Sequence, residues 1–377
     1  MNVMDVHRRC ENTAYNLMGD AALARSEGLV FPYKGVLPPA DCALQGPSAL
    51  GMAKLKWSSR RDYCHSFTGF SAFVRKYHWC EDSYAGVLAE FVHFCWSTGA
   101  AAKGTLNSLM SCMMYVCEDA RATVTRAQKA LAGWQTYMPS KPWAPAPRAV
   151  VYLCALLLVR STSGCDVDAG LALVLGFHLY ARGGELDASR CDDFTDVDDL
   201  RNVHAVPTVL LFDTKTGTRG IPQMITVDDP CMADLFRFTV QRARAREPDN
   251  PNPYLFSFPK GSLLGAFKGA QLALGFPKAL WVRHSVRHGA ATDDYVRKLR
   301  SLTEISLRLR HQNEKTSKGY LQDAAALALL KNLPAGVIDR IEAAGGAQGL
   351  LLQVVERLDI IDTGGNWYFL LASSREN

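Results

Sequence analysis

The chain has 377 residues, enough for two domains with real cores, and its 48% hydrophobic and 21% charged residues are typical of a globular protein. Its net charge of +5 is too small to identify a nucleic-acid ligand by itself. The longest apolar run, near 149–159, is about half the length of a membrane span, so we expect no membrane contact. The 11 cysteines contain no C-x-x-C pair and no zinc template, which predicts reduced thiols in an intracellular protein.

The first half of the sequence predicts an irregular arm, a helical bundle and a linker. Residues 1–58 carry scattered prolines and glycines, with one helix expected near Glu11–Arg25. Residues 59–137 contain four stretches with apolar residues at helical spacing, which predict a compact helical domain. Residues 138–148 hold four prolines and predict a stiff, extended linker.

The second half predicts a mixed catalytic domain at 149–330 and a helical tail at 331–377. The expected helices and strands, in chain order, are helices at 149–160 and 168–186, strands at 206–212 and 221–227, a charged loop at 242–252, and helices at 262–274, 284–299, 302–310 and around Tyr320. The apolar residues of the tail must be buried against their own domain or a neighbour. The fold class expected is therefore mainly α with a small β-sheet (α+β).

Positive charge is concentrated between Trp281 and Tyr320. This stretch has nine Lys or Arg residues against four acidic residues, an excess that equals the net charge of the whole chain. Such a basic face suits a phosphate backbone, and the alternative is a solvated helix surface.

Six residues, in chain order, could together break a phosphodiester bond without a metal ion. That reaction needs a nucleophile, cations for the phosphorane and an acid for the leaving oxygen. Arg182 lies in A-R-G-G-E-L, Lys215 in a predicted hairpin turn, His284 and Arg287 in H-S-V-R-H-G-A-A-T, and His311 nine residues before Tyr320. Each residue alone has an ordinary structural explanation, such as an ion pair, a solvated turn or packing. The ordered set is what indicates DNA strand transfer.

This set resembles the active site of the tyrosine recombinases, over about residues 60–325. The resemblance implies that Tyr320 attacks the phosphate and forms a 3′-phosphotyrosine, while Arg182 and Arg287 hold its oxygens. It also implies that His311 stabilises the transition state, Lys215 protonates the leaving 5′ oxygen and His284 assists proton transfer. No cofactor, metal ion or ATP is expected.

The motif around His284 is most similar to recombinases of the DIRS-like and Crypton mobile elements. The usual Leu-Gly before the second histidine is Leu309-Arg310 here, and the tail is longer than in minimal members. The resemblance also implies a double-stranded DNA partner clamped by both domains. Four subunits would assemble on two DNA sites, with 331–377 as a candidate interface.

Further basic residues are candidate contacts to DNA phosphates, with solvated surface as the alternative for each. They are Arg121, Arg126, Lys129, Lys141, Arg219, Arg283, Arg310 and Lys318. Two other functions remain open: a type IB topoisomerase or telomere resolvase that uses the same residues, and a domesticated DNA-binding protein without catalysis. A DNA enzyme is expected in the nucleus of a eukaryotic host, and otherwise in the cytoplasm or nucleoid.

Overall fold

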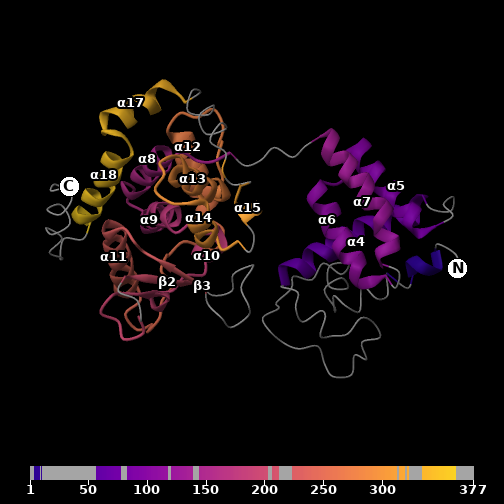
Figure 1. The fold of residues 1–377 in the computed structure, drawn as a ribbon, viewed down its shortest axis with the longest axis horizontal. Coiled ribbons are helices and arrows are strands. Elements are labelled where there is room, and N and C mark those ends of the chain that lie inside the picture. Colours follow the sequence, from indigo (N-terminus) through magenta and orange to yellow (C-terminus); the bar gives the residue numbers. More distant parts are fainter. Residues whose placement is uncertain are drawn as a thin grey trace. The chain divides into compact units, whose positions relative to one another are not determined.

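The computed structural model describes residues 4–8, 10, 57–77, 83–117, 120–138, 144–202, 206–211, 223–311, 314–318, 321 and 333–361. The chain divides into two compact units, Met1–Lys141 and Pro142–Asn377. The helix predicted near Glu11–Arg25 lies outside the described residues. The described part is mostly helical with one small sheet, as the fold-class prediction required (Figure 1).

The first unit is a helical bundle. Its helices are α4 (Trp57–Tyr77), α5 (Tyr84–Thr98), α6 (Lys103–Val116) and α7 (Ala120–Tyr137). Helix α5 packs against α7, and α4 packs against α6 (Figure 1). The apolar residues that predicted these helices form the core, where Phe70, Leu88, Leu106 and Leu109 are fully buried. Burial of these apolar side chains is the main force that holds the bundle together.

The second unit is built around α9 (Gly164–His178), which is buried over most of its length. Every residue from Val167 to Phe177 of α9 is buried, because α8, α11, α12 and α13 all pack against it. The other helices are α8 (Arg148–Val159), α10 (Gly183–Leu186), α11 (Pro230–Arg246), α12 (Leu263–Ala273), α13 (Arg283–Val296), α14 (Leu302–Arg308) and α15 (Glu314–Lys318), followed by α17 (Ala335–Ala343) and α18 (Gly346–Ile361).

The sheet has three antiparallel strands in the order β1-β2-β3. These are β1 (Phe194–Thr195), β2 (Thr208–Leu211) and β3 (Gln223–Thr226), with Val209 opposite both Phe194 and Ile225. The two predicted strands are present but shorter, and β1 was not predicted. A two-residue strand has too little sequence to show an alternating pattern.

Helix α11 differs from the sequence prediction, which placed a charged loop at 242–252. The helix begins after Asp229, whose side chain accepts from Cys231 N at 2.9 Å, and continues to Arg246. Its last turns carry Arg242 and Arg246, which bond the nearly buried carboxylate of Asp168 on α9 at 2.8 and 3.1 Å. Cations near a helix C-terminus are favourable, so these charges end the helix in an ion-pair cluster.

The tail buries its apolar face on its own chain. Helix α18 packs along α8, and Val337, Leu350, Val354 and Leu358 belong to the same core as α8 and α9 (Figure 1). Of the two outcomes expected for this segment, the structure therefore gives burial within the chain. Among the described residues, no helix has the length and apolarity needed to cross a membrane.

Candidate active site

Arg182 follows a sharp break in the chain that the sequence did not predict. One helix was expected over 168–186, but α9 stops at His178 and α10 starts at Gly183. Tyr180 takes a left-handed conformation (φ 51°), and Ala181 N donates to Gly176 O at 3.0 Å, which closes the end of α9. Glycine is the usual residue at such a position, so a tyrosine gave no signal of the break.

Glu185 fixes the side chain of Arg182. Its Oε1 accepts from Arg182 Nη1 at 2.8 Å, and its Oε2 accepts from the backbone N–H of Arg182 at 2.7 Å. The Arg182 side chain keeps 21% of its surface exposed, while that of Glu185 keeps 5%. Among the described residues, this ion pair uses only Nη1, which leaves the Nε and Nη2 donors of Arg182 for another acceptor.

Arg283 lies beside Arg182 because residue 183 is a glycine. A Cβ on Gly183 would be 2.4 Å from Arg283 Nε, so any larger residue would compete for this space. Arg283 Nη1 donates to both carboxylate oxygens of Asp187 at 2.8 Å. The cation suggested as a DNA contact is thus held by a buried acid at the edge of the site.

Arg287, on α13, joins the ends of two other helices. Its side chain is fully buried, and its guanidinium donates to the carbonyls of Tyr180, after α9, and Leu309, after α14. The carbonyls at a helix C-terminus carry partial negative charge, so a guanidinium there is favourable.

The back of α13 touches the segment that enters the unit. Ala146 N donates to Ser285 O at 2.9 Å, and a Cβ on Gly289 would lie 1.9 Å from Ala146 O. Only glycine at 289 allows this approach. The small residues after the H-x-x-R motif are therefore explained by packing.

His311 is placed by the end of α14. Arg310 adopts a left-handed conformation (φ 55°), and His311 N donates to Ser306 O at 3.0 Å. On the ring side, His311 Nδ1 lies 2.9 Å from the hydroxyl of Ser317 on α15, which in turn donates to Ser306 Oγ at 3.0 Å. The ring orientation is thus fixed from two helices.

Four of the predicted residues, Arg182, His284, Arg287 and His311, lie close enough for their charges to interact. Burial first, and then the nearby charges of Arg287, Arg182, Arg310 and His284, lower the pKa of His311 to about 4. His284 also packs edge-on against His288, with ring centroids 4.7 Å apart. Of the three arginines near His311, two bond the carboxylate of Glu185, so the arginines leave an excess of positive charge, which is what an anion-binding site requires.

The structure thus places Arg182, His284, Arg287 and His311 at one location. The other two predicted catalytic residues, Lys215 and Tyr320, lie outside the described residues. Among the described residues, no group of three or more His, Cys, Asp or Glu is arranged to hold a metal ion.

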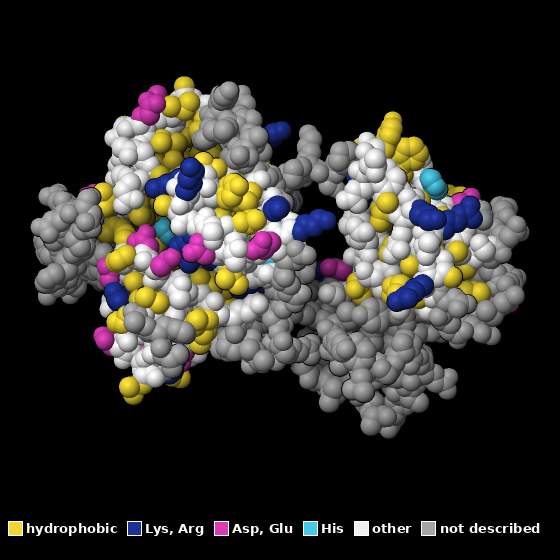
Figure 2. All heavy atoms as spheres, viewed as in Figure 1, with side chains coloured by type: hydrophobic (Ala, Val, Ile, Leu, Met, Phe, Trp, Pro, Cys, Tyr) yellow, Lys and Arg dark blue, Asp and Glu magenta, His cyan; other side chains and the backbone are white. Residues whose placement is uncertain are grey.

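The candidate DNA contacts have different environments. Arg121, Arg126 and Lys129 are exposed on α7, and Lys318 is exposed on α15, whereas Lys141 and Arg219 are outside the described residues. Figure 2 shows dark-blue Lys and Arg side chains on both units and acidic ones among them on the second, so no single-sign field covers this face. Arg310 needs a correction: its side chain is only 4% exposed and bonds Glu185, because it points into the unit.

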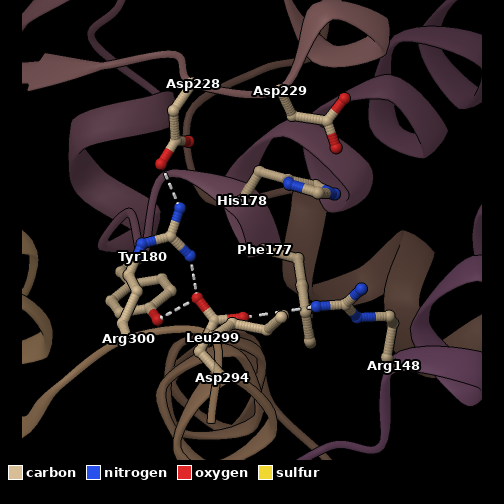
Figure 3. A pocket seen from close by; sticks show the side chains of 9 residues that line it. All are labelled: Arg148, Phe177, His178, Tyr180, Asp228, Asp229, Asp294, Leu299 and Arg300. Atoms are coloured by element: carbon tan, nitrogen blue, oxygen red, sulfur yellow. Dashed lines mark hydrogen bonds and ion pairs between the residues drawn. The ribbon is translucent and has the colours of Figure 1, made fainter. Parts of the chain in front are cut away.

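A second polar cluster lies on the other side of Tyr180, around a cavity of about 280 Å³ (Figure 3). Asp294 accepts from the hydroxyl of Tyr180 at 2.6 Å and also bonds Arg148 and Arg300, and Arg300 reaches Asp228. Ion pairs join three acids, Asp228, Asp293 and Asp294, to three arginines, Arg148, Arg300 and Arg308, and Asp229 also lines the cavity. The neighbouring His178 is bonded to Tyr152 at 2.7 Å, and burial lowers its pKa to about 3. The sequence gave no indication of this cluster.

Comparison with solved structures identifies the fold. The XerH site-specific recombinase bound to palindromic difH substrate, a post-cleavage complex, matches with a TM-score of 0.53 and 15% identity, over 83% of this chain and 92% of that one. Its pre-cleavage complex gives 0.50 and 14%, over 85% and 96%. A lambda integrase dimer bound to a COC′ core site gives 0.50 and 16%, over 73% and 74%.

The chain has the fold of these site-specific recombinases. At such identities the likeness concerns the recombinase fold alone, since function depends on the site. The sequence matches no protein-family model and no curated protein.

Proposed function

We propose that this protein is a site-specific DNA recombinase that cuts and rejoins double-stranded DNA through a 3′-phosphotyrosine. The observation that carries the proposal is that three residues far apart in sequence lie together in one electropositive site: Arg182 before α10, Arg287 on α13 and His311 after α14. The recombinase fold supports the proposal independently, because the six residues were chosen from the sequence pattern and not from the fold.

The reaction proposed is a transesterification at phosphorus. The phenol oxygen of Tyr320 attacks, the bond from phosphorus to the 5′ oxygen breaks, and the products are a 3′-phosphotyrosine and a free 5′-hydroxyl. The phenol loses its proton, and Lys215 supplies one to the leaving oxygen. The phosphotyrosine keeps the energy of the ester bond, so the reverse attack by a 5′-hydroxyl reseals DNA without ATP.

The arginines and histidines stabilise the phosphorane in this scheme. Arg182 presents its Nε and Nη2 donors to a nonbridging oxygen, and neutral His311 donates to another from Nε2 once the Ser317 hydroxyl turns to donate to Nδ1. His284 assists proton transfer. Arg287 has no exposed surface in the unbound protein, so its contact with the phosphate requires the atoms that cover it to move when DNA binds.

The finer identity and assembly are also part of the proposal. The DIRS-like or Crypton mobile-element subgroup rests on the motif at His284, and four subunits would act on two DNA sites. Because α18 buries its apolar face on α8, that face is not available between subunits, and the tetramer would use other surfaces. The protein would act in the nucleus of a eukaryotic host, and otherwise in the cytoplasm or nucleoid.

The test is to trap the covalent intermediate. The purified chain is incubated with a library of nicked duplexes of randomised sequence. After cleavage, the short downstream fragment that carries the freed 5′-hydroxyl diffuses away, which prevents resealing. Denaturation-resistant protein–DNA adducts are collected and their DNA is sequenced, with Tyr320→Phe as the matched control because it removes only the hydroxyl.

We expect adducts with the parent protein and none with Tyr320→Phe, although both bind DNA equally. A preferred sequence in the adducts supports a site-specific recombinase, whereas sequence-independent adducts with relaxation of supercoiled plasmid would identify a topoisomerase. Absence of adducts on DNA that the protein demonstrably binds would overturn the proposal in favour of a DNA-binding protein.

A further inference from the structure

Arg310 occupies a backbone position that suits glycine. Helix α14 ends at Arg308 and Leu309 caps it. Arg310 follows at φ 55°, and its N donates to Leu307 O at 2.8 Å. This left-handed conformation brings Cβ close to a carbonyl oxygen and is unfavourable for residues other than glycine. A residue that keeps this conformation with a long charged side chain must gain something from that side chain.

The side chain of Arg310 points into the candidate active site and bonds groups there. It is 4% exposed, and Nη2 donates to Glu185 Oε2 at 2.5 Å and to Tyr180 O at 3.3 Å, while Nη1 donates to Arg308 O at 2.9 Å. Burial lowers the pKa of Arg310 to about 10, opposed by the charge of Glu185, which favours the charged form. The guanidinium is therefore a charged group at neutral pH.

Glu185 is the acceptor that Arg310 shares with Arg182. Its Oε2 receives both Arg310 Nη2 and the backbone N–H of Arg182, while its Oε1 receives Arg182 Nη1. Because Arg310 holds Oε2, the carboxylate cannot rotate to take a second guanidinium nitrogen of Arg182. Arg182 is thereby bound at one nitrogen, with two other donors directed elsewhere.

We propose that Arg310 is a positioning residue for strand cleavage: through Glu185 it sets the direction in which Arg182 presents its free donors to the scissile phosphate, and it adds a buried third cation beside His311. This inference rests on the proposed function and concerns the same site. It assigns Arg310 a role inside the protein instead of a contact with DNA.

The charged groups that face His311 come from every element around it. They are Arg287 and His284 from α13, Arg182 from the start of α10, and Arg310 itself, with Glu185 as the acid that bonds two of the arginines. Loss of Arg310 removes one of these cations. The pKa of His311 then rises, and Glu185 becomes free to bind Arg182 through two nitrogens.

Arg310→Gly is the direct test, and Lys298→Gly is its matched control. Lys298 also follows a helix end in the left-handed conformation (φ 56°), after α13, but it is exposed. Both substitutions place glycine where the backbone favours it, which in Arg310→Gly offsets part of the stability lost with the buried ion pair to Glu185, so rates are compared at a temperature where both variants are folded. Only Arg310→Gly removes a guanidinium from the site.

The measurement is single-turnover adduct formation on the nicked duplexes selected with the parent protein, followed against pH. We expect Arg310→Gly to react about a hundredfold more slowly, the loss typical of a catalytic group displaced by about 1 Å, with unchanged DNA affinity. We also expect the acidic limb of its rate profile to move to higher pH, since His311 is protonated more easily. Lys298→Gly should match the parent in rate and pH profile.

A parent-like rate and pH profile for Arg310→Gly would overturn the inference while leaving the proposed function intact. If Arg310→Gly does not fold, Arg310→Lys is used: it keeps the charge but cannot bridge Glu185 and Tyr180 as a planar fork, so a parent-like profile would again overturn the inference. Failure of the parent protein itself to form adducts is the separate result that would overturn the proposed function.

Discussion

Two clusters of charged residues flank Tyr180. Both contain arginines and carboxylates, but one is a candidate active site and the other is a set of mutual ion pairs. The carbonyl of Tyr180 accepts from Arg287 and Arg310 in the candidate active site, whereas its hydroxyl donates to Asp294 in the cluster of Figure 3. One residue at the end of α9 thus joins both regions.

The difference between the regions is their charge balance. In the cluster of Figure 3, Asp228 and Asp294 neutralise Arg148 and Arg300, and the ions satisfy one another. In the candidate site, Glu185 bonds both Arg182 and Arg310, and Asp187 bonds Arg283 at the edge, while Arg287 adds a further positive charge. Arginines paired with carboxylates satisfy one another within the fold, whereas an excess of positive charge creates a binding site for an anion.

The largest expected effect is a loss of reaction rate from a substitution in the candidate active site, compared with a loss of stability from one in the cluster of Figure 3. Arg182→Ala removes free donors aimed at the phosphate, so we expect adduct formation to slow by about 10²–10³-fold with little change in melting temperature. Arg300→Ala breaks ion pairs in the balanced cluster, so it should lower the melting temperature and leave the rate per folded molecule near that of the parent. Equal loss of rate in both variants would contradict the comparison.

A smaller effect tests the balanced cluster alone. Asp294→Asn keeps the size of a buried side chain but removes the charge that faces Arg148 and Arg300, so we expect the free energy of unfolding to fall by about 2 kcal/mol. Urea unfolding followed by circular dichroism measures this change. Glu304→Gln, at an exposed helix start, is the control and should change stability by about 0.5 kcal/mol or less.

The smallest effect is a pH dependence that both regions share. The pKa values of His311 and His178 are lowered to about 4 and about 3, so both rings are neutral in the folded protein at pH 6. Unfolding lets them take up protons below their usual pKa near 6.5, and stability therefore falls as the pH drops from about 6.5 toward 4.

DNA should distinguish the two histidines. A bound phosphate anion raises the pKa of His311 but not that of His178, so DNA should relieve only part of the acid sensitivity. Melting curves between pH 7 and pH 5, with and without DNA, measure this, and His311→Gln should remove the part that DNA relieves. Full relief by DNA in that variant would contradict the assignment.

Much of the fold was predictable because it depends on local periodicity. The apolar spacing in 59–137 predicted the four helices of the bundle, and the ranges 149–160, 262–274 and 302–310 predicted α8, α12 and α14 within about two residues. The break before Arg182 was not predictable, since a left-handed tyrosine carries no residue-type signal.

The catalytic roles assigned from the sequence stay predictions, and Lys215 and Tyr320 lie outside the described residues. The order of Arg182, His284, Arg287 and His311 identified groups that the fold does bring together. The role of Arg310 was missed because its partner, Glu185, is 125 residues away in sequence, and nothing local indicates that the side chain turns inward.

The close approach of Gly289 to Ala146 has a mechanical consequence. The chain that arrives from the first unit is hydrogen-bonded to α13 at Ser285 and has no room to shift against Gly289. These anchor points lie within one helical turn of Arg287. A pull on the chain at Ala146 is therefore transmitted to α13, the helix that carries H-x-x-R.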